Sequence, residues 1–129
     1  MKILIIGGGA SGMFLASMIE NKNNTRVTLV EKNSKLGKKL LLTGNGKCNF
    51  TSGDFSDLND IYNNDFARNI YLRYDNKSFI DFMKNIGVEP KVEIHKGYKF
   101  YYPNSNKSTS VYYSLIDKIH SNNINILFN

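Results

Sequence analysis

The 129-residue chain contains one cysteine, two prolines, two histidines and no tryptophan. A single cysteine excludes an internal disulfide, and we expect a reducing, cytoplasmic location. The cysteine and the histidines are scattered along the sequence without the spacing of metal ligands, so no metal site is predicted. The chain also lacks an apolar run of about 18 residues, the length that a transmembrane helix needs, and we expect no membrane span.

Acidic residues are the scarcer charge, with 11 of them against 17 lysines and arginines and a net charge of +6. A basic chain can bind nucleic acid through its phosphates. Here the lysines are spread along the sequence and are not massed on one predicted helix. Solvated lysines and a phosphate-bearing cofactor account for the excess, so no nucleic-acid partner is predicted. An RNA-binding domain stays as a weaker alternative.

The clearest motif lies at the start of the chain, where a predicted strand leads into a run of glycines. Residues 2–6 are apolar and β-branched and predict a buried strand, which the sequence GGGASG at 7–12 follows. Residues 10–22 predict a helix, and residues 26–31 predict a second parallel strand that ends on Glu31. This order is typical of a dinucleotide-binding fold.

Each position of the motif has a physical role in holding a dinucleotide. Gly7 permits the tight turn after the strand, Gly9 lets a diphosphate approach the backbone, and Gly12 lets the helix lie close to the sheet. The amino end of the helix directs free N–H groups and a partial positive charge at the phosphates. Glu31 can accept hydrogen bonds from ribose hydroxyls, and its charge argues against the 2′-phosphate of NADP.

Periodicity and turn residues predict the remaining elements. Helices are predicted over 64–72, 76–86 and 107–121, with a short helix near 36–42. Short strands are predicted over 91–94 and 98–102, joined around residues 96–97, and a returning strand over 124–129. The fold class is therefore α/β: a partial Rossmann-like fold with a parallel βαβ core, a helical and short-strand excursion and a third parallel strand. Helices on one side leave an apolar face of the sheet open, so we expect the front part of a larger protein.

Local signals also predict which residues face the core and which cap the helices. One face of the first helix is expected to carry Ala10, Met13, Phe14 and Met18. Asp75 or Asn76 is expected to cap the helix that follows it, with Gly87 at its end. Ser105 or Ser108 is expected to cap the last helix.

A second glycine-containing segment follows Glu31 and could lie beside the same cofactor. Glycines on both sides of Asn45 leave the backbone free to adopt left-handed conformations and to approach a flat ring closely. Lys38, Lys39 and Lys47 could add positive charge near a diphosphate or a reduced ring. A surface loop with solvated lysines is the alternative interpretation of this segment.

Together the two motifs resemble those of the BaiN / aminoacetone-oxidase-like family of FAD-dependent flavoproteins. The residues that carry the resemblance are Gly7-Gly8-Gly9-Ala10-Ser11-Gly12, Glu31-Lys32, Gly37-Lys38-Lys39 and Thr43-Gly44-Asn45-Gly46-Lys47-Cys48-Asn49. Thr51 also matches, whereas Ser52 stands where the family commonly has asparagine. Looser similarity, including Pro103, Ser105 and Lys107, extends over nearly the whole chain.

The resemblance implies an FAD-binding fold with a substrate domain inserted later in the sequence. It assigns the FAD diphosphate to Gly7, Gly9, Ala10, Ser11 and Gly12. It assigns the adenosine ribose to Glu31, with Lys32 and Lys39 beside it. It places Thr43, Gly44, Asn45, Gly46, Lys47, Cys48 and Asn49 near the ribityl chain and the isoalloxazine. Residues 1–56 would be the dinucleotide-binding part, 57–122 a mainly helical excursion and 123–129 the returning strand. Because family members are roughly three times this length, the chain is expected to lack its substrate domain and to be inactive alone.

The cofactor expected from this reasoning is FAD. NAD shares the ADP half, but a classical NAD dehydrogenase would reach its third strand sooner after the acidic residue. The substrate would be an unidentified small organic molecule, with NAD(P)H as a candidate reductant, and no catalytic residue is identified. Cys48 has no partner cysteine for dithiol chemistry. A nucleotide-binding or interaction module without catalysis is the alternative function.

Overall fold

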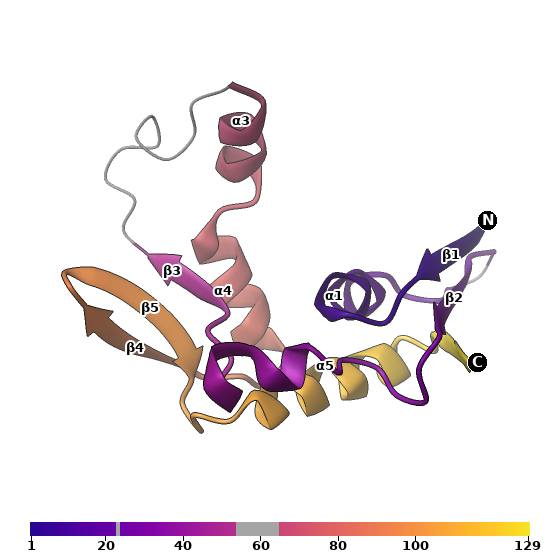
Figure 1. The fold of residues 1–129 in the computed structure, drawn as a ribbon. Helices are drawn as coiled ribbons and strands as arrows, with labels where there is room; N and C mark the ends of the chain where they lie inside the picture. Colours follow the sequence, from indigo (N-terminus) through magenta and orange to yellow (C-terminus); the bar gives the residue numbers. More distant parts are fainter. Residues whose placement is uncertain (23, 54–64) are drawn as a thin grey trace.

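A three-stranded parallel sheet forms one end of the molecule in the computed structural model, which describes residues 1–22, 24–53 and 65–129 (Figure 1). Its strands are β1 (Lys2–Ile6), β2 (Arg26–Glu31) and β6 (Asn125–Phe128). The central strand is β2, which pairs in parallel with both neighbours. The predicted α/β class, the βαβ core and the returning parallel strand are therefore confirmed.

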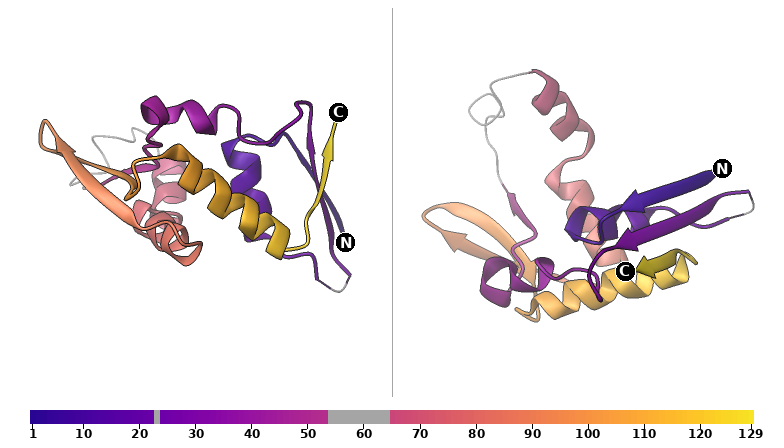
Figure 2. Two further views of the ribbon diagram at one scale, coloured as in Figure 1. Left: turned by 90° about the horizontal axis from the view of Figure 1, so that it is seen from below. Right: turned by 45° about the vertical axis from the view of Figure 1, so that its right-hand side comes forward.

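Helices α1 (Ala10–Met18) and α5 (Ser108–Ser121) lie together on one side of this sheet (Figure 2). Side chains alternate across a strand, and those on the helix side, such as Val27 and Leu29, are almost fully buried. On the other side, Leu4 and Ile6 are 60% and 81% exposed. The apolar face that the sequence predicts to be open is thus open.

Helix α1 is shorter than the predicted helix 10–22, because a residue distant in sequence terminates it. The amide of Asn122 donates hydrogen bonds to the carbonyls of Ser17 (2.8 Å) and Ala16 (3.5 Å). These carbonyls belong to the last turn, which has no intrahelical donors. The expected buried face was also partly wrong: Met13 is buried, but Met18 is 56% exposed.

A second, antiparallel sheet forms the other end of the molecule (Figure 1). Its strands, in the order β3-β5-β4, are β3 (Thr51–Gly53), β4 (Pro90–His95) and β5 (Tyr98–Pro103). The hairpin turns at Lys96 and Gly97, whose φ angles are 51° and 83°. Two successive left-handed residues are typical of the turn that best matches strand twist, and the predicted strand pair is confirmed.

Two helices, α3 (Asp65–Arg73) and α4 (Asn76–Asn85), precede the hairpin. Asp75 caps α4 as predicted, because its carboxylate accepts the N–H of Ser78 at 2.8 Å. Gly87 follows the helix with a φ of 85°. The helix predicted over 64–72 is present from residue 65, and residue 64 lies outside the described residues.

Helix α5 passes from the hairpin to the parallel sheet and contacts elements of both ends (Figure 2). The predicted caps of this helix were wrong: its first flanking residue is Lys107, and no side chain caps it. The hydroxyl of Ser108 instead donates to the carbonyl of Leu41 (2.8 Å), and that of Ser105 bonds the hydroxyl of Ser110 (2.6 Å). A long-range contact thus engages the Ser108 hydroxyl, and local contacts engage that of Ser105.

The contact between α1 and the turn before it predicts the effect of Gly12→Ala. A Cβ atom at Gly12 would lie 1.9 Å from the carbonyl oxygen of Gly7. The variant should lose about 1–3 kcal/mol of unfolding free energy, measured by urea denaturation. Gly9→Ser is the matched control, because a Cβ there meets nothing within 4 Å and serine favours the position that flanks a helix. Equal destabilisation of both variants would contradict this account.

Candidate functional site

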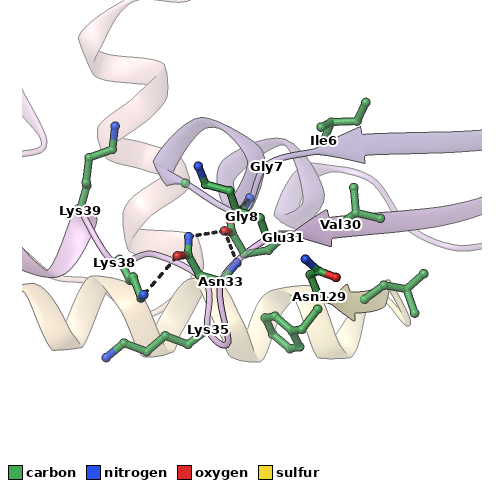
Figure 3. A pocket seen from close by; sticks show the side chains of 14 residues that line it. Ile6, Gly7, Gly8, Val30, Glu31, Asn33, Lys35, Lys38, Lys39 and Asn129 are labelled. Carbon is green, nitrogen blue, oxygen red and sulfur yellow. Dashed lines mark hydrogen bonds between the residues drawn. The ribbon is translucent and has the colours of Figure 1, made fainter.

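A groove of about 780 Å³ lies at the carboxyl edge of the parallel sheet, where Figure 3 shows the residues that line it. Its walls come from the first glycine turn, the end of β2, the segment after β2 and the end of β6. The lining residues are Ile6, Gly7, Gly8, Gly9, Val30, Glu31, Lys32, Asn33, Lys35, Lys38, Lys39, Leu127, Phe128 and Asn129. Ligands of open α/β sheets bind at this edge.

Three of the four glycines in the turn are required by the chain's own backbone and packing. Gly7 has a φ of 98°, which favours glycine. A Cβ at Gly8 would lie 2.2 Å from the Leu36 side chain, and one at Gly12 would overlap a carbonyl. Gly9 is different, because its φ of −75° suits any residue and a Cβ there would project into open space.

The carboxylate of Glu31 joins the turn to the segment that follows β2. It accepts the backbone N–H of Gly8 at 2.7 Å and that of Asn33 at 2.8 Å. The side-chain amide of Asn33 also donates to it, and Lys38 donates to Asn33 at 3.1 Å (Figure 3). The hydrogen bonds from the N–H groups of Asn33 and Gly8 hold the pKa of Glu31 below its ordinary value.

The groove carries more positive than negative charge. Four lysines line it, at positions 32, 35, 38 and 39, against the single carboxylate of Glu31. The first turn of α1 adds to this positive charge. No side chain caps the helix at Gly9, so the N–H groups of its first turn keep their partial positive charge unpaired by a side-chain cap. Such an arrangement favours an anion of two or more charges.

The second glycine segment contains the 3₁₀ element η1 (Leu40–Gly46), which is interrupted by non-helical backbone at Thr43, Gly44 and Asn45. It begins later than the short helix predicted near 36–42. Gly44, Asn45 and Gly46 have φ angles of 56°, 54° and 83°. The predicted left-handed backbone is therefore confirmed at three successive residues. We call residues 43–49 the second glycine loop.

Cys48 fixes the end of the second glycine loop inside the protein. The residue is 2% exposed, and its N–H donates to the carbonyl of Thr43 at 3.0 Å. Burial raises the pKa of the thiol, so it is protonated at neutral pH. A buried, protonated thiol is a poor nucleophile, which agrees with the absence of a dithiol motif.

A second cavity, of about 390 Å³, brings the two glycine segments together. Ala10 and Ser11 at the start of α1 line one side of it. Thr43, Cys48 and Asn49 of the second glycine loop line the other. Residues 9 and 10 are adjacent in the chain, so the groove and this cavity both adjoin the start of α1.

The predicted site residues thus fall into three groups. Those in the groove are Gly7, Gly9, Glu31, Lys32 and Lys39, and those in the second cavity are Ala10, Ser11, Thr43, Cys48 and Asn49. Gly12 supports the turn, while Gly44, Asn45, Gly46 and Lys47 are not among the lining residues of either cavity.

The predicted site residues did not include Gly8 and Asn33, which both line the groove and donate backbone N–H groups to Glu31. Lys38, which was expected to add positive charge near a diphosphate, lines the groove and donates to Asn33. The signal for Asn33 is local, since an amide two residues after an acidic strand end can fold back on it. Among residues 1–22, 24–53 and 65–129, no cluster of three or more histidine, cysteine or acidic side chains could hold a metal ion. Over the same ranges, no helix has the length and apolarity required to cross a bilayer.

Comparison with known proteins gives one family over the whole chain. The family model described as "HI0933-like protein Rossmann domain" matches residues 1–129. The chain is 34% identical over 113 residues to a 3-dehydro-bile acid delta(4,6)-reductase of Clostridium scindens. It is also 34% identical over 86 residues to a ribosomal RNA dihydrouridine synthase of Haemophilus influenzae, and 33% identical over 90 residues to that of Escherichia coli.

These alignments cover 85%, 66% and 66% of this chain but only 26%, 21% and 21% of the three relatives. The chain therefore spans about a quarter of the length of the curated relatives it matches. Among solved structures, the crystal structure of Thermovibrio ammonificans THI4 has a TM-score of 0.50 and 15% identity. That match covers 98% of this chain and 38% of the other, and it supports the fold.

The hydrogen bonds of Glu31 predict a particular dependence of stability on pH. A carboxyl group whose pKa is lowered by folding stabilises the protein above its unfolded-state pKa, and this contribution disappears as the pH falls through the lowered value. Glu31→Gln should therefore be less stable than the wild type at pH 7, and the two should converge in acid. Thermal unfolding across the acid range measures this difference; parallel curves would contradict the assignment.

Proposed function

The chain belongs to the HI0933-like family of Rossmann domains, the flavoprotein family that its two glycine motifs resemble; on this premise we propose that its groove binds the adenosine diphosphate part of FAD. The observation that carries the proposal is Gly9. Neither its backbone angles nor its neighbours require glycine, yet its missing side chain leaves the backbone open beside the start of α1. A diphosphate is the group that profits from this opening.

In the proposal, the remaining groove residues recognise the sugar and the charge. A carboxylate offers about four lone-pair positions, and Glu31 uses three of them for Gly8 and Asn33. The position left on Oε2 would accept a ribose hydroxyl. Lys32 and Lys39 would balance the charge of the diphosphate. The carboxylate disfavours a 2′-phosphate, which supports FAD over an NADP-type ligand.

The second cavity is the proposed location of the ribityl chain and the flavin ring. Ala10 and Ser11 would direct N–H groups toward the phosphates from one side, and Thr43, Cys48 and Asn49 would line the ribityl side. A bound flavin would supply two-electron redox chemistry. The role of this chain would be to hold and orient the ring. The buried Cys48 would contribute apolar surface and no thiolate.

For the whole protein we propose an oxidoreductase in which this chain supplies the cofactor domain. The substrate is proposed to be a small organic molecule bound largely by a separate domain, with NAD(P)H as the candidate reductant and the cytoplasm as the location. Two relatives are ribosomal RNA dihydrouridine synthases. A base of RNA is therefore the alternative substrate that we consider. Reduction assays with an unsaturated ketone and with an RNA oligonucleotide would separate the two.

Binding of FAD by the chain tests the proposed function. The wild type should quench the fluorescence of FAD on titration, and should bind ADP more weakly because the second cavity would stay empty. Gly9→Ser should weaken FAD binding at least about tenfold, the equivalent of about 1.4 kcal/mol, since its side chain would fill the opening. The same variant should be no less stable than the wild type without ligand.

Three results would decide between the readings. Equal affinity for FAD and ADP would favour a nucleotide-binding module without a flavin site. Unchanged FAD affinity in Gly9→Ser would contradict the placement of the diphosphate. Failure of the folded wild-type chain to bind either ligand would contradict the proposal as a whole.

A further inference from the structure

Lys47 of the second glycine loop lines neither cavity and contacts the hairpin. Its Nζ lies 3.7 Å from Oε2 of Glu93 on β4, and 5.7 Å from the ring centroid of Tyr102 on β5. Glu93 is separated from this loop by more than forty positions in the sequence. The hairpin thus contacts the loop through a charged side chain.

We propose that Glu93 is a positioning residue for the second glycine loop: it holds Lys47 against the hairpin and thereby fixes the left-handed backbone of residues 44–46. The loop needs an external anchor, because Gly44 and Gly46 leave the backbone free to adopt many other conformations. A left-handed residue with a Cβ atom, as at position 45, persists only where the surroundings determine it. Asn45 is the most demanding of the three residues, since it carries a side chain at a φ of 54°.

The other anchors of the loop act on its two ends. The Thr43 hydroxyl donates to the carbonyl of Leu40 at 2.7 Å before residues 44–46, and Cys48, which is also left-handed with a φ of 60°, is buried after them. The N–H of Phe50 then donates to the carbonyl of Tyr101 at 3.0 Å. Two backbone hydrogen bonds close across the left-handed residues, from Lys47 to the carbonyl of Gly44 (3.1 Å) and from Cys48 to that of Thr43 (3.0 Å). The contact of the Lys47 side chain with Glu93 ties this closed loop to the hairpin.

The hairpin is a suitable support because it is paired to the strand that leaves the loop. Phe100 of β5 stands opposite Glu93 of β4 on one side and Ser52 of β3 on the other. Glu93 is therefore in the same row across the sheet as Ser52, two strands away. Pairing thus fixes Glu93 in the same small sheet as β3, the strand that begins four residues after Lys47.

Glu93 has two lysines and a histidine as neighbours and little exposure to water. Its side chain is 18% exposed, and it contacts Lys47 from the loop together with Lys91 (3.1 Å) and His95 (3.3 Å) from β4. The hydrogen bond from Lys91, followed by that from His95 and the charge of Lys47, lowers the pKa of Glu93. The carboxylate is thus ionised at neutral pH and attracts Lys47. Lys91 provides a matched control, since it binds the same carboxylate without belonging to the loop.

The first arm of the test needs no ligand. In ¹⁵N–¹H correlation spectra of the folded chain, Glu93→Gln and Lys47→Met should both shift the amide signals of Gly44, Asn45 and Gly46. Lys91→Met should leave these signals in place, and Glu93→Asp, which keeps the charge, should shift them less than Glu93→Gln does. Unchanged loop signals in Glu93→Gln, or equal shifts in Lys91→Met, would overturn the proposal. Thermal unfolding of each variant confirms that it is folded.

The second arm rests on the proposed function and measures FAD affinity. Glu93→Gln should raise the dissociation constant about two- to fivefold, the range expected for a partly exposed ion pair. When Glu93→Gln is added to the Lys47→Met variant, the dissociation constant should not rise further. When it is added to the Lys91→Met variant, the dissociation constant should rise by the full factor. An additive effect with Lys47→Met would overturn the proposal. If the wild type does not bind FAD, the proposed function fails and the amide spectra alone decide the role of Glu93.

Discussion

The site depends on a short set of hydrogen bonds that fasten the first glycine turn to the end of β2. The N–H of Gly7 donates to the carbonyl of Val30 at 2.8 Å, and the N–H of Gly8 donates to the carboxylate of Glu31 at 2.7 Å. The N–H of Gly37 then donates to the carbonyl of Gly8 at 2.7 Å. One carboxylate thus holds the turn in place and lines the groove, and in the proposed function the same carboxylate would bind the ribose.

Much of the fold could be predicted because the residues that determine it are close together in the sequence. The strand, glycine turn, helix and second strand all follow one another within residues 2–31, and each residue type has a conformational reason to be there. The left-handed positions around Asn45 were predictable for the same reason. Short-range capping by Asp75 was also predicted, since donor and acceptor are three residues apart.

The predictions that failed are those decided by contacts between distant parts of the chain. Helix α1 ends at Met18 because Asn122, more than a hundred positions later, satisfies its last carbonyls. Ser108 does not cap α5, because its hydroxyl reaches Leu41 instead. The contact of Lys47 with Glu93 had no sequence signal at all, since nothing in either segment indicates that the hairpin lies beside the loop.

Helix α5 connects the two ends of the molecule, and with them the groove and the second glycine loop. Helix α5 contacts the parallel sheet side of the molecule through α1 and the hairpin side through β5, so it keeps the groove and the second glycine loop in a fixed relation. The groove holds the charge-bearing residues, and the second cavity is lined mainly by apolar side chains such as Phe14 and Leu115. A ligand with an anionic diphosphate in its middle and a flat ring at one end fits this division.

The measurement that tests the central claim most directly is a crystal structure of the chain grown with FAD. The account predicts the diphosphate against Gly9, within hydrogen-bond distance of the N–H groups of Ala10 and Ser11, and a ribose hydroxyl on Oε2 of Glu31. A diphosphate located elsewhere, or a Glu31 carboxylate without contact to the sugar, would contradict it.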